Sequence, residues 1–249
     1  MAPSNKINIG IVGCGGVALA NHLPGFALCP DASVVALCDK NPAVLERAKK
    51  ETGIADACLD YRELVDRKDV DAVVIATSND VHSAIVKAAV AAGKHVLCEK
   101  PLALDHAEAA TMLQAAEAAS VRHMTAFTYR FVPAMRYMAH LAAEGTVGRL
   151  YHVRVQRFQD WGHRALGWRQ VKALAGSGEL GDMLSHRIDF AHILAGRIAR
   201  VGRVSEIRAV RQSSRAVAGR PRAANPAVGA LHRSVHLRPP AARRGLPSH

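Results

Sequence analysis

The sequence predicts an α/β protein whose first half is a doubly wound parallel sheet. Short apolar runs alternate with helical stretches over residues 1–126, a glycine-rich turn follows the first run, and an acid ends the second. This alternation is typical of parallel sheets whose strands are covered on both faces. For the second half we predict an incomplete α+β domain with an open-faced sheet.

The first strand is predicted over residues 6–12, followed at once by a turn and a helix. The turn fits G-x-G-x-x-A: Gly13 permits a tight bend, Gly15 lets the backbone approach a pyrophosphate, and Ala18 lets the helix pack on the strand. Free N–H groups and the positive dipole end of the helix then favour an anion. We therefore predict a Rossmann-type site for a dinucleotide that also includes Gly16 and Val17.

The second strand, over residues 33–38, ends in Asp39, a little over 20 residues beyond the glycines. A carboxylate there can accept hydrogen bonds from the adenosine ribose. Asp39 favours NAD, because it would repel a 2′-phosphate, whereas Lys40 can offset such a charge, so NADP stays open. The alternative is that Asp39 is a turn residue before a helix that begins at Asn41-Pro42.

Two further strands are predicted over residues 71–77 and 95–98, separated by a helix over 81–92 that Gly93 closes. Another helix is expected from about residue 105 to 119. Ligands of parallel sheets bind beyond the carboxyl ends of the strands, which is where residues 77–79 and 99–101 fall.

In the second half, residues 150–158 alternate apolar and polar side chains, which predicts a strand with one covered and one open face. Arg154 and Gln156 share the open face. They can bind substrate hydroxyls, or they can simply be solvated.

Residues 176–189 carry the most informative polar pattern. At helical spacing Asp182, His186 and Asp189 fall on one side, whereas Leu184, Ile188, Ala191 and Ala195 fall on the other and are expected to pack. A histidine has an ordinary pKa of about 6.5 and suits the removal of a proton from an alcohol. Asp189, one turn on, can orient the imidazole, and Asp182 can fix a neighbouring hydroxyl. A surface helix with an intrahelical Asp–His pair is the alternative.

Three segments resemble the Gfo/Idh/MocA family of oxidoreductases, relatives of glucose-fructose oxidoreductase and inositol dehydrogenase. Residues 76–82 (ATSNDVH) and 93–103 (GKHVLCEKPLA) closely resemble its T-x-N-x-x-H and E-K-P segments. Residues 176–189 resemble its G-G-G-x-L-x-D-x-G-x-H-x-x-D helix, with Ser177 and Ser185 where glycines are usual. Residues 129–133 look like its crossover into the second domain.

The resemblance implies NAD(P)-dependent hydride transfer between a nicotinamide and a sugar, polyol or related alcohol. It makes Lys100 a catalytic residue beside Asp182, His186 and Asp189, with no metal, and it implies a homo-oligomer for an intact relative. The residues that it places on the cofactor side are Thr77, Ser78, Asn79, His82, Glu99, Lys100 and Arg130.

We predict three regions: a Rossmann domain over 1–126, a partial substrate domain over 127–205, and a basic tail over 206–249. Ten arginines and one acid give residues 201–249 a charge of +9 of the chain's +12, and no aromatic residue follows Phe190. Such a tail is expected to be disordered or read out of frame, with a genuine basic arm as the alternative. The resemblance stops near residue 205, so a non-catalytic NAD(P)-binding protein is the competing function.

Composition excludes several other classes. No apolar run is long enough to span a membrane and no signal peptide is evident, so we expect a soluble cytoplasmic protein. The charge lies on a tail without aromatic residues, which argues against nucleic-acid binding. The five cysteines have no zinc-site spacing and are expected to be reduced core residues.

Overall fold

A computed structural model describes residues 6–157, 167–202 and 235–237. The chain divides into two compact units, one of residues 1–132 and 156–187 and the other of residues 133–155 and 188–249. The chain thus leaves the first unit after Val132 and returns to it at Gln156. The sequence-based boundaries at 126 and 205 stay a prediction.

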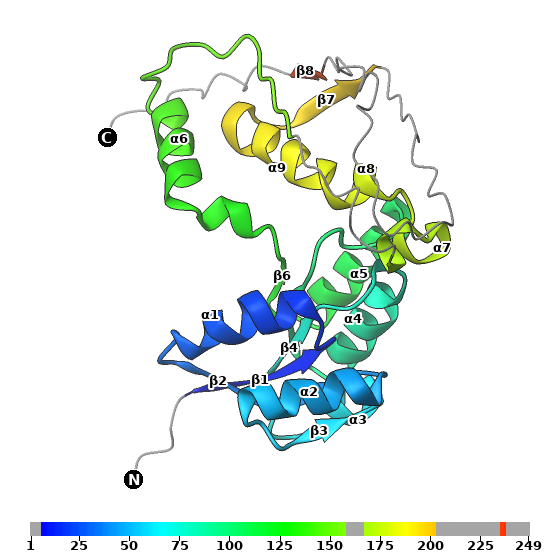
Figure 1. Ribbon diagram of the computed structural model, residues 1–249. Coiled ribbons are helices and arrows are strands. Elements are labelled where there is room, and N and C mark those ends of the chain that lie inside the picture. Colours follow the sequence, from blue (N-terminus) through cyan, green and yellow to red (C-terminus); the bar gives the residue numbers. More distant parts are fainter. Residues whose placement is uncertain (1–5, 158–166, 203–234, 238–249) are drawn as a thin grey trace, which may run out of the picture. The chain divides into compact units, whose positions relative to one another are not determined.

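The first unit is built on a six-stranded parallel sheet in the order β3-β2-β1-β4-β5-β6 (Figure 1). This is the strand order of a doubly wound dinucleotide fold, which confirms the predicted class. Its strands are β1 (Ile7–Val12), β2 (Ala32–Cys38), β3 (Ala57–Cys58), β4 (Ala72–Ile75), β5 (His95–Cys98) and β6 (His123–Thr125).

Helices cover both faces of this sheet. Leu45 and Ala48 of α2 (Pro42–Thr52) pack with Ala18 of the short π-helix η1 (Ala18–His22), the π turn, against one face, and Leu64 and Ile85 pack against the other. The elements of the first face are η1 (Ala18–His22), α1 (Leu23–Ala27) and α2 (Pro42–Thr52). Those of the second are α3 (Tyr61–Val65), η2 (Asn79–Val81), α4 (His82–Ala91) and α5 (His106–Ala118).

Local capping chemistry sets where several of these helices begin and end. The Asn41 side chain accepts hydrogen bonds from two N–H groups in the first turn of α2, and Asp105 accepts one from Glu108 at the start of α5. Gly93 follows α4 with a φ of +73°, a left-handed conformation that favours glycine. The helices predicted over 81–92 and 105–119 are therefore confirmed within a residue or so of their ends.

Two sequence-based expectations differ from the structure in the second half. Residues 150–157 form no strand, and Phe158 lies outside the described residues. A strand needs a hydrogen-bonded neighbour, and the described part of the chain pairs none with this segment. Also, the single helix expected to carry Asp182 to Asp189 is two helices, α8 (Glu179–Asp182) and α9 (Leu184–Ala195).

The break at Met183 has a visible cause. The main-chain carbonyl of Asp182 accepts hydrogen bonds from the Lys100 ammonium at 3.2 Å and from the Ser185 hydroxyl at 3.0 Å. A carbonyl bonded to side chains in this way is drawn out of the regular helical ladder. The remaining elements of the first unit are η3 (Thr128–Phe131), η4 (Trp168–Gln170) and α7 (Lys172–Ala175).

The second unit holds α6 (Pro133–Ala143), most of α9, and β7 (Ile198–Val201), which pairs antiparallel with β8 (Val235–Leu237). The residues of β8 are the part of the predicted tail that the structure describes. No helix among the described residues has the length and apolar character needed to cross a membrane.

All five cysteines are free thiols. Cys14, Cys38 and Cys98 are buried and Cys58 is half-buried, as expected of core residues, whereas Cys29 is exposed at the end of α1. Burial raises the pKa of the Cys14 thiol to about 12, which keeps it protonated at neutral pH.

Candidate active site

The carboxyl ends of four neighbouring strands meet at one edge of the sheet. Strand β1 ends at Val12, β2 at Cys38, β4 at Ile75 and β5 at Cys98. Because all four run in parallel, the residues that follow them share this edge, which we call the carboxyl edge. It brings together the glycine turn, Asp39, residues 77–79 and residues 99–101.

The glycine turn leaves room for a ligand close to the main chain. Gly13 has a φ of +93°, and a Cβ there would lie 2.7 Å from the Ala76 carbonyl, so only glycine fits. A Cβ on Gly15 or Gly16 would meet no atom within 4 Å. Ala18 is fully buried, and no side chain caps the π turn at Val17. The open space at Gly15 and Gly16 therefore fits a pyrophosphate group close to the main chain at the start of a helix.

Asp39 is held against this turn by two hydrogen bonds. Its Oδ2 accepts from the Cys14 N–H at 2.9 Å, and its Oδ1 accepts from the Asn41 N–H at 2.9 Å. The carboxylate is half-buried, and Lys40 beside it is exposed. Asp39 is thus a turn residue at the carboxyl edge. Its ribose contact stays a prediction.

The segment after β4 is tied to other parts of the first unit. Asn79 is buried, and its amide donates to the Ala175 carbonyl at 3.3 Å. The ring nitrogens of fully buried His82 lie 3.0 Å from the Pro101 carbonyl and 3.3 Å from that of Thr77. Burial lowers the pKa of His82, and a neutral imidazole carries a single N–H, so the ring can donate to only one of these two carbonyls. The direct cofactor contacts predicted for Thr77, Ser78, Asn79 and His82 are not tested by this geometry.

Glu99 and Lys100 follow β5 and face different partners. Glu99 Oε1 lies 2.8 Å from His22 Nε2, and Glu99 Oε2 accepts from the Lys100 N–H at 3.2 Å. The Lys100 ammonium donates to the Asp182 carboxylate. Sequence reasoning missed His22, because nothing in the chain between residues 22 and 99 signals that they meet.

Asp182 lies between two cations. It accepts from Lys100 on Oδ1 and from the Arg169 guanidinium on Oδ2 at 3.0 Å. Burial by itself would raise the pKa of Asp182, but the hydrogen bonds and charges of Lys100 and Arg169 together hold it below its usual value. Asp182 is therefore ionised at neutral pH and fixes the lysine. Arg169, which also stacks on the Trp168 ring, was not predicted.

His186 is buried in a partly aromatic setting. Its ring meets that of Tyr129 edge to face at 4.7 Å and that of Phe127 at 5.9 Å. Burial, together with the charges of Lys100, Arg187 and Arg157, lowers the pKa of His186 to about 4, against the opposing charge of Asp182. The imidazole is therefore neutral at physiological pH and able to accept a proton.

The polar face predicted for residues 182–189 is the buried one. Asp182, His186 and Asp189 are 7%, 5% and 4% exposed. Of the residues expected to pack, Ala191 is buried, Leu184 and Ala195 are half-buried, and Ile188 is 42% exposed. His186 Nδ1 has no hydrogen-bond partner among the described residues, so its orientation by Asp189 stays a prediction. Arg130 is exposed, with its guanidinium 5.6 Å from the Phe127 ring centre, and its cofactor contact is likewise untested.

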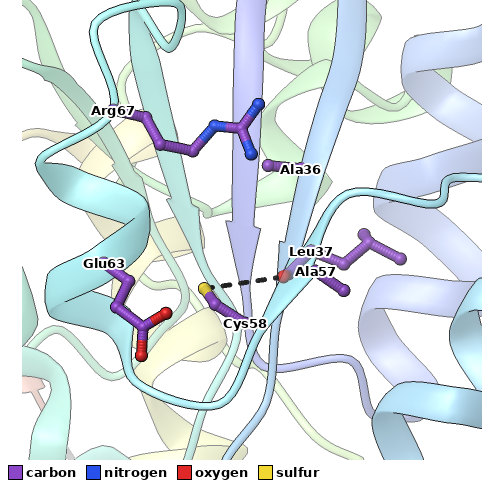
Figure 2. Close-up of a pocket in the computed structure, with 6 residues that line it drawn as sticks. All are labelled: Ala36, Leu37, Ala57, Cys58, Glu63 and Arg67. Carbon is purple, nitrogen blue, oxygen red and sulfur yellow. Dashed lines mark hydrogen bonds between the residues drawn. The ribbon is translucent and has the colours of Figure 1, made fainter.

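Figure 2 shows a different feature, a pocket of about 240 Å³ beside β2, β3 and α3. Glu63 and Arg67 line it on the helix side, and the Cys58 thiol points to the Leu37 carbonyl 3.9 Å away. It contains none of the residues of the carboxyl edge that were predicted to act. The described residues also include no group of acids, histidines and cysteines that can hold a metal ion.

Comparison with known proteins identifies both halves of the chain. Residues 7–127 match the family model described as "Oxidoreductase family, NAD-binding Rossmann fold", and residues 135–243 match the "GFO/IDH/MocA C-terminal domain". The second match extends into the region that we predicted to be a tail.

Two proteins of similar sequence are named as dehydrogenases. Levoglucosan dehydrogenase from Pseudarthrobacter phenanthrenivorans is 36% identical over 80% of this chain and 54% of its own length. Myo-inositol 2-dehydrogenase from Thermotoga maritima is 30% identical over 76% of this chain and 55% of its own. The chain thus spans about half the length of these relatives.

Solved structures give the same result. A levoglucosan dehydrogenase in complex with NADH and levoglucosan superposes with a TM-score of 0.69 at 33% identity, over 78% of this chain and 55% of that one. An oxidoreductase domain protein from Kribbella flavida gives 0.70 at 38% identity, over 76% and 52%.

Proposed function

Because the chain belongs to the Gfo/Idh/MocA family of oxidoreductases, with an NAD-binding Rossmann domain, we propose that it oxidises a secondary alcohol of a sugar or polyol. The observation that carries this proposal is the cluster of half-buried Lys100 with buried Asp182 and His186 beside the carboxyl edge. A lysine, an ionised acid and a neutral imidazole together supply the groups that an alcohol needs in order to lose a hydride and a proton.

The carboxyl edge holds the cofactor in this proposal. Main-chain N–H groups of the glycine turn would hold the pyrophosphate, Asp39 would accept from the adenosine ribose, and residues 77–79 and Glu99 would border the nicotinamide side. The nicotinamide ring, when bound, supplies the hydride acceptor. Asp39 favours NAD, and the exposed Lys40 leaves NADP as the second possibility.

His186 takes the proton of the substrate hydroxyl. It is neutral at physiological pH, and its aromatic neighbours keep bulk water from the ring. The ammonium of Lys100 donates to the same substrate oxygen and opposes the negative charge that develops as the proton leaves. The Lys100 charge also disfavours protonated His186, so the imidazole is neutral before it takes the proton.

Asp182 and Asp189 orient these groups. Asp182 keeps the ammonium of Lys100 in place and offers its remaining lone pairs to a neighbouring substrate hydroxyl. Arg169, whose side chain is 41% exposed, holds the other oxygen of Asp182 and leaves part of its guanidinium open to substrate. Asp189, buried one turn beyond His186, stabilises the imidazolium that forms.

The substrate class follows from the relatives, whose names state action on levoglucosan and myo-inositol. The direct test mixes the protein with NAD and each of levoglucosan, myo-inositol and scyllo-inositol, and follows the absorbance of NADH. We expect reduction of NAD with at least one cyclic polyol and none with the Lys100→Met variant.

A separate titration of NADH fluorescence distinguishes the competing function. Tight NADH binding without oxidation across a broad polyol panel would favour a non-catalytic NAD(P)-binding protein. Failure to bind NADH at all would contradict both functions.

A further inference from the structure

A line of hydrogen bonds, through three side-chain contacts and the Lys100 main chain, joins His22 of the π turn to Asp182. His22, the last residue of that turn, is 8% exposed and lies 2.8 Å from Glu99. Glu99 in turn accepts from the peptide N–H of Lys100, whose ammonium donates to Asp182. His22 is the first member of this line, and the proposed mechanism gives it no role.

The geometry defines what His22 does chemically. A carboxylate only accepts hydrogen bonds, so the Nε2 that faces Glu99 carries the hydrogen. The Glu99 side chain is 14% exposed, and an ionised group removed from water to that extent needs hydrogen-bond donors. Two donors are visible among the described residues, the His22 ring and the Lys100 N–H.

The Glu99 carboxylate can still accept hydrogen bonds from a ligand. A carboxylate offers about four lone-pair directions, and two of these are used by His22 and the Lys100 N–H. Glu99 directly follows β5, so its carboxylate lies at the carboxyl edge, where the cofactor is proposed to bind. A carboxylate that is held on both oxygens can accept hydroxyl or amide donors without first being ordered, which lowers the entropic cost of binding.

We propose that His22 is a positioning residue for the cofactor, which fixes the Glu99 carboxylate toward hydrogen-bond donors of a bound nicotinamide dinucleotide. The inference rests on the proposed cofactor site at the carboxyl edge. Through the bond between Glu99 and the Lys100 N–H, His22 also steadies the main chain from which the catalytic lysine extends. Loss of the His22 side chain is therefore expected to weaken cofactor binding, and not only to lower the stability of the fold.

A matched pair of substitutions separates this role from simple packing. Glutamine and methionine have similar length, but only glutamine can donate a hydrogen bond to Glu99. We expect His22→Met to raise the NADH dissociation constant about tenfold, the loss of one hydrogen bond to a charged group. His22→Gln should stay within about threefold of the wild type. His106→Met, at the exposed start of α5, serves as a control that leaves the affinity unchanged.

A double-mutant cycle on NADH affinity supplies the decisive readout. In a Glu99→Met background, where the acceptor is gone, His22→Met should change the dissociation constant less than about twofold. Equal loss of affinity with and without Glu99, or equal affinity of His22→Met and the wild type, would overturn the proposal. If His22→Met does not fold, a loss of affinity in His22→Gln equal to that of Glu99→Met would overturn it as well.

The controls also separate this proposal from the one on which it rests. Absence of NADH binding by the wild type would reject the cofactor site itself. Binding by the wild type that is indifferent to His22 would reject only the positioning role.

Discussion

The glycine-turn side and the α8–α9 side of the candidate site are built in opposite ways. The first uses main-chain N–H groups, open space above Gly15 and Gly16, and one carboxylate tied to the turn. The second uses buried ionisable side chains from distant parts of the sequence, with Asp182 between two cations and His186 beside aromatic rings. Substitutions on the first side should therefore weaken cofactor binding. Substitutions on the second side should lower kcat or the free energy of unfolding.

The largest expected effect is a loss of turnover, without a loss of cofactor affinity, when His186 is replaced. His186→Ala removes the proposed base and should lower kcat by about 10² to 10⁴, the usual contribution of a positioned base. The NADH dissociation constant should change little, because His186 belongs to the second side. Steady-state kinetics on the substrate found in the polyol panel, together with an NADH titration, measure the two quantities.

A milder variant tests the orienting acid in the same assay. Asp189→Asn should lower kcat less than His186→Ala, since the base is kept. A His186→Ala protein with normal turnover would break the comparison between the two sides.

The next effect concerns stability. Asp182→Asn removes the charge that pairs with Lys100, whose side chain is only 14% exposed, and should lower the free energy of unfolding by about 3 kcal/mol, because this largely desolvated cation loses its charged partner. Urea denaturation measures this change. Asp69→Asn breaks an exposed pair with Arg67 and should cost clearly less. An equal loss for both variants would show that the α8–α9 cluster is no more sensitive than a surface ion pair.

A smaller effect is expected on the glycine-turn side. Asp39→Ala should weaken NADH binding about 10- to 100-fold, the range for a hydrogen bond to a charged group, and should leave the binding of substrate analogues unaffected. Asp66→Ala, an exposed acid at the end of α3, is the matched control. Unchanged affinity in Asp39→Ala would leave Asp39 as a turn residue alone.

The last effect is a pH dependence that arises on the second side. The pKa of His186 is about 4 in the folded chain and near 6.5 in the unfolded one, so the unfolded state binds more protons between these values. The free energy of unfolding should therefore fall as the pH drops from about 6.5 to about 4. His186→Gln should show a shallower fall over this window, while buried His82, whose pKa is also lowered, contributes equally to both proteins. Parallel curves for the two proteins would contradict a neutral buried imidazole.

Local sequence patterns were enough to predict most of the first unit. The strands β1, β2, β4 and β5, the helices α4 and α5, and the glycine turn follow from patterns within short windows, because apolar periodicity, caps and positive-φ glycines are local properties. The acidic, histidine and lysine candidates came from such patterns together with the family motifs. The same local reasoning predicted a strand over 150–158 that the described residues do not form.

Tertiary structure alone decided which side chains meet. The pairs His22–Glu99, Lys100–Asp182 and Tyr129–His186 join residues far apart in the chain. It also decided that the polar face of α8 and α9 is buried while Ile188 is exposed, and that the helix breaks at Met183. The physical reason is that burial and hydrogen bonding of a charged group depend on the partners that surround it in space, and spacing along the chain does not specify those partners.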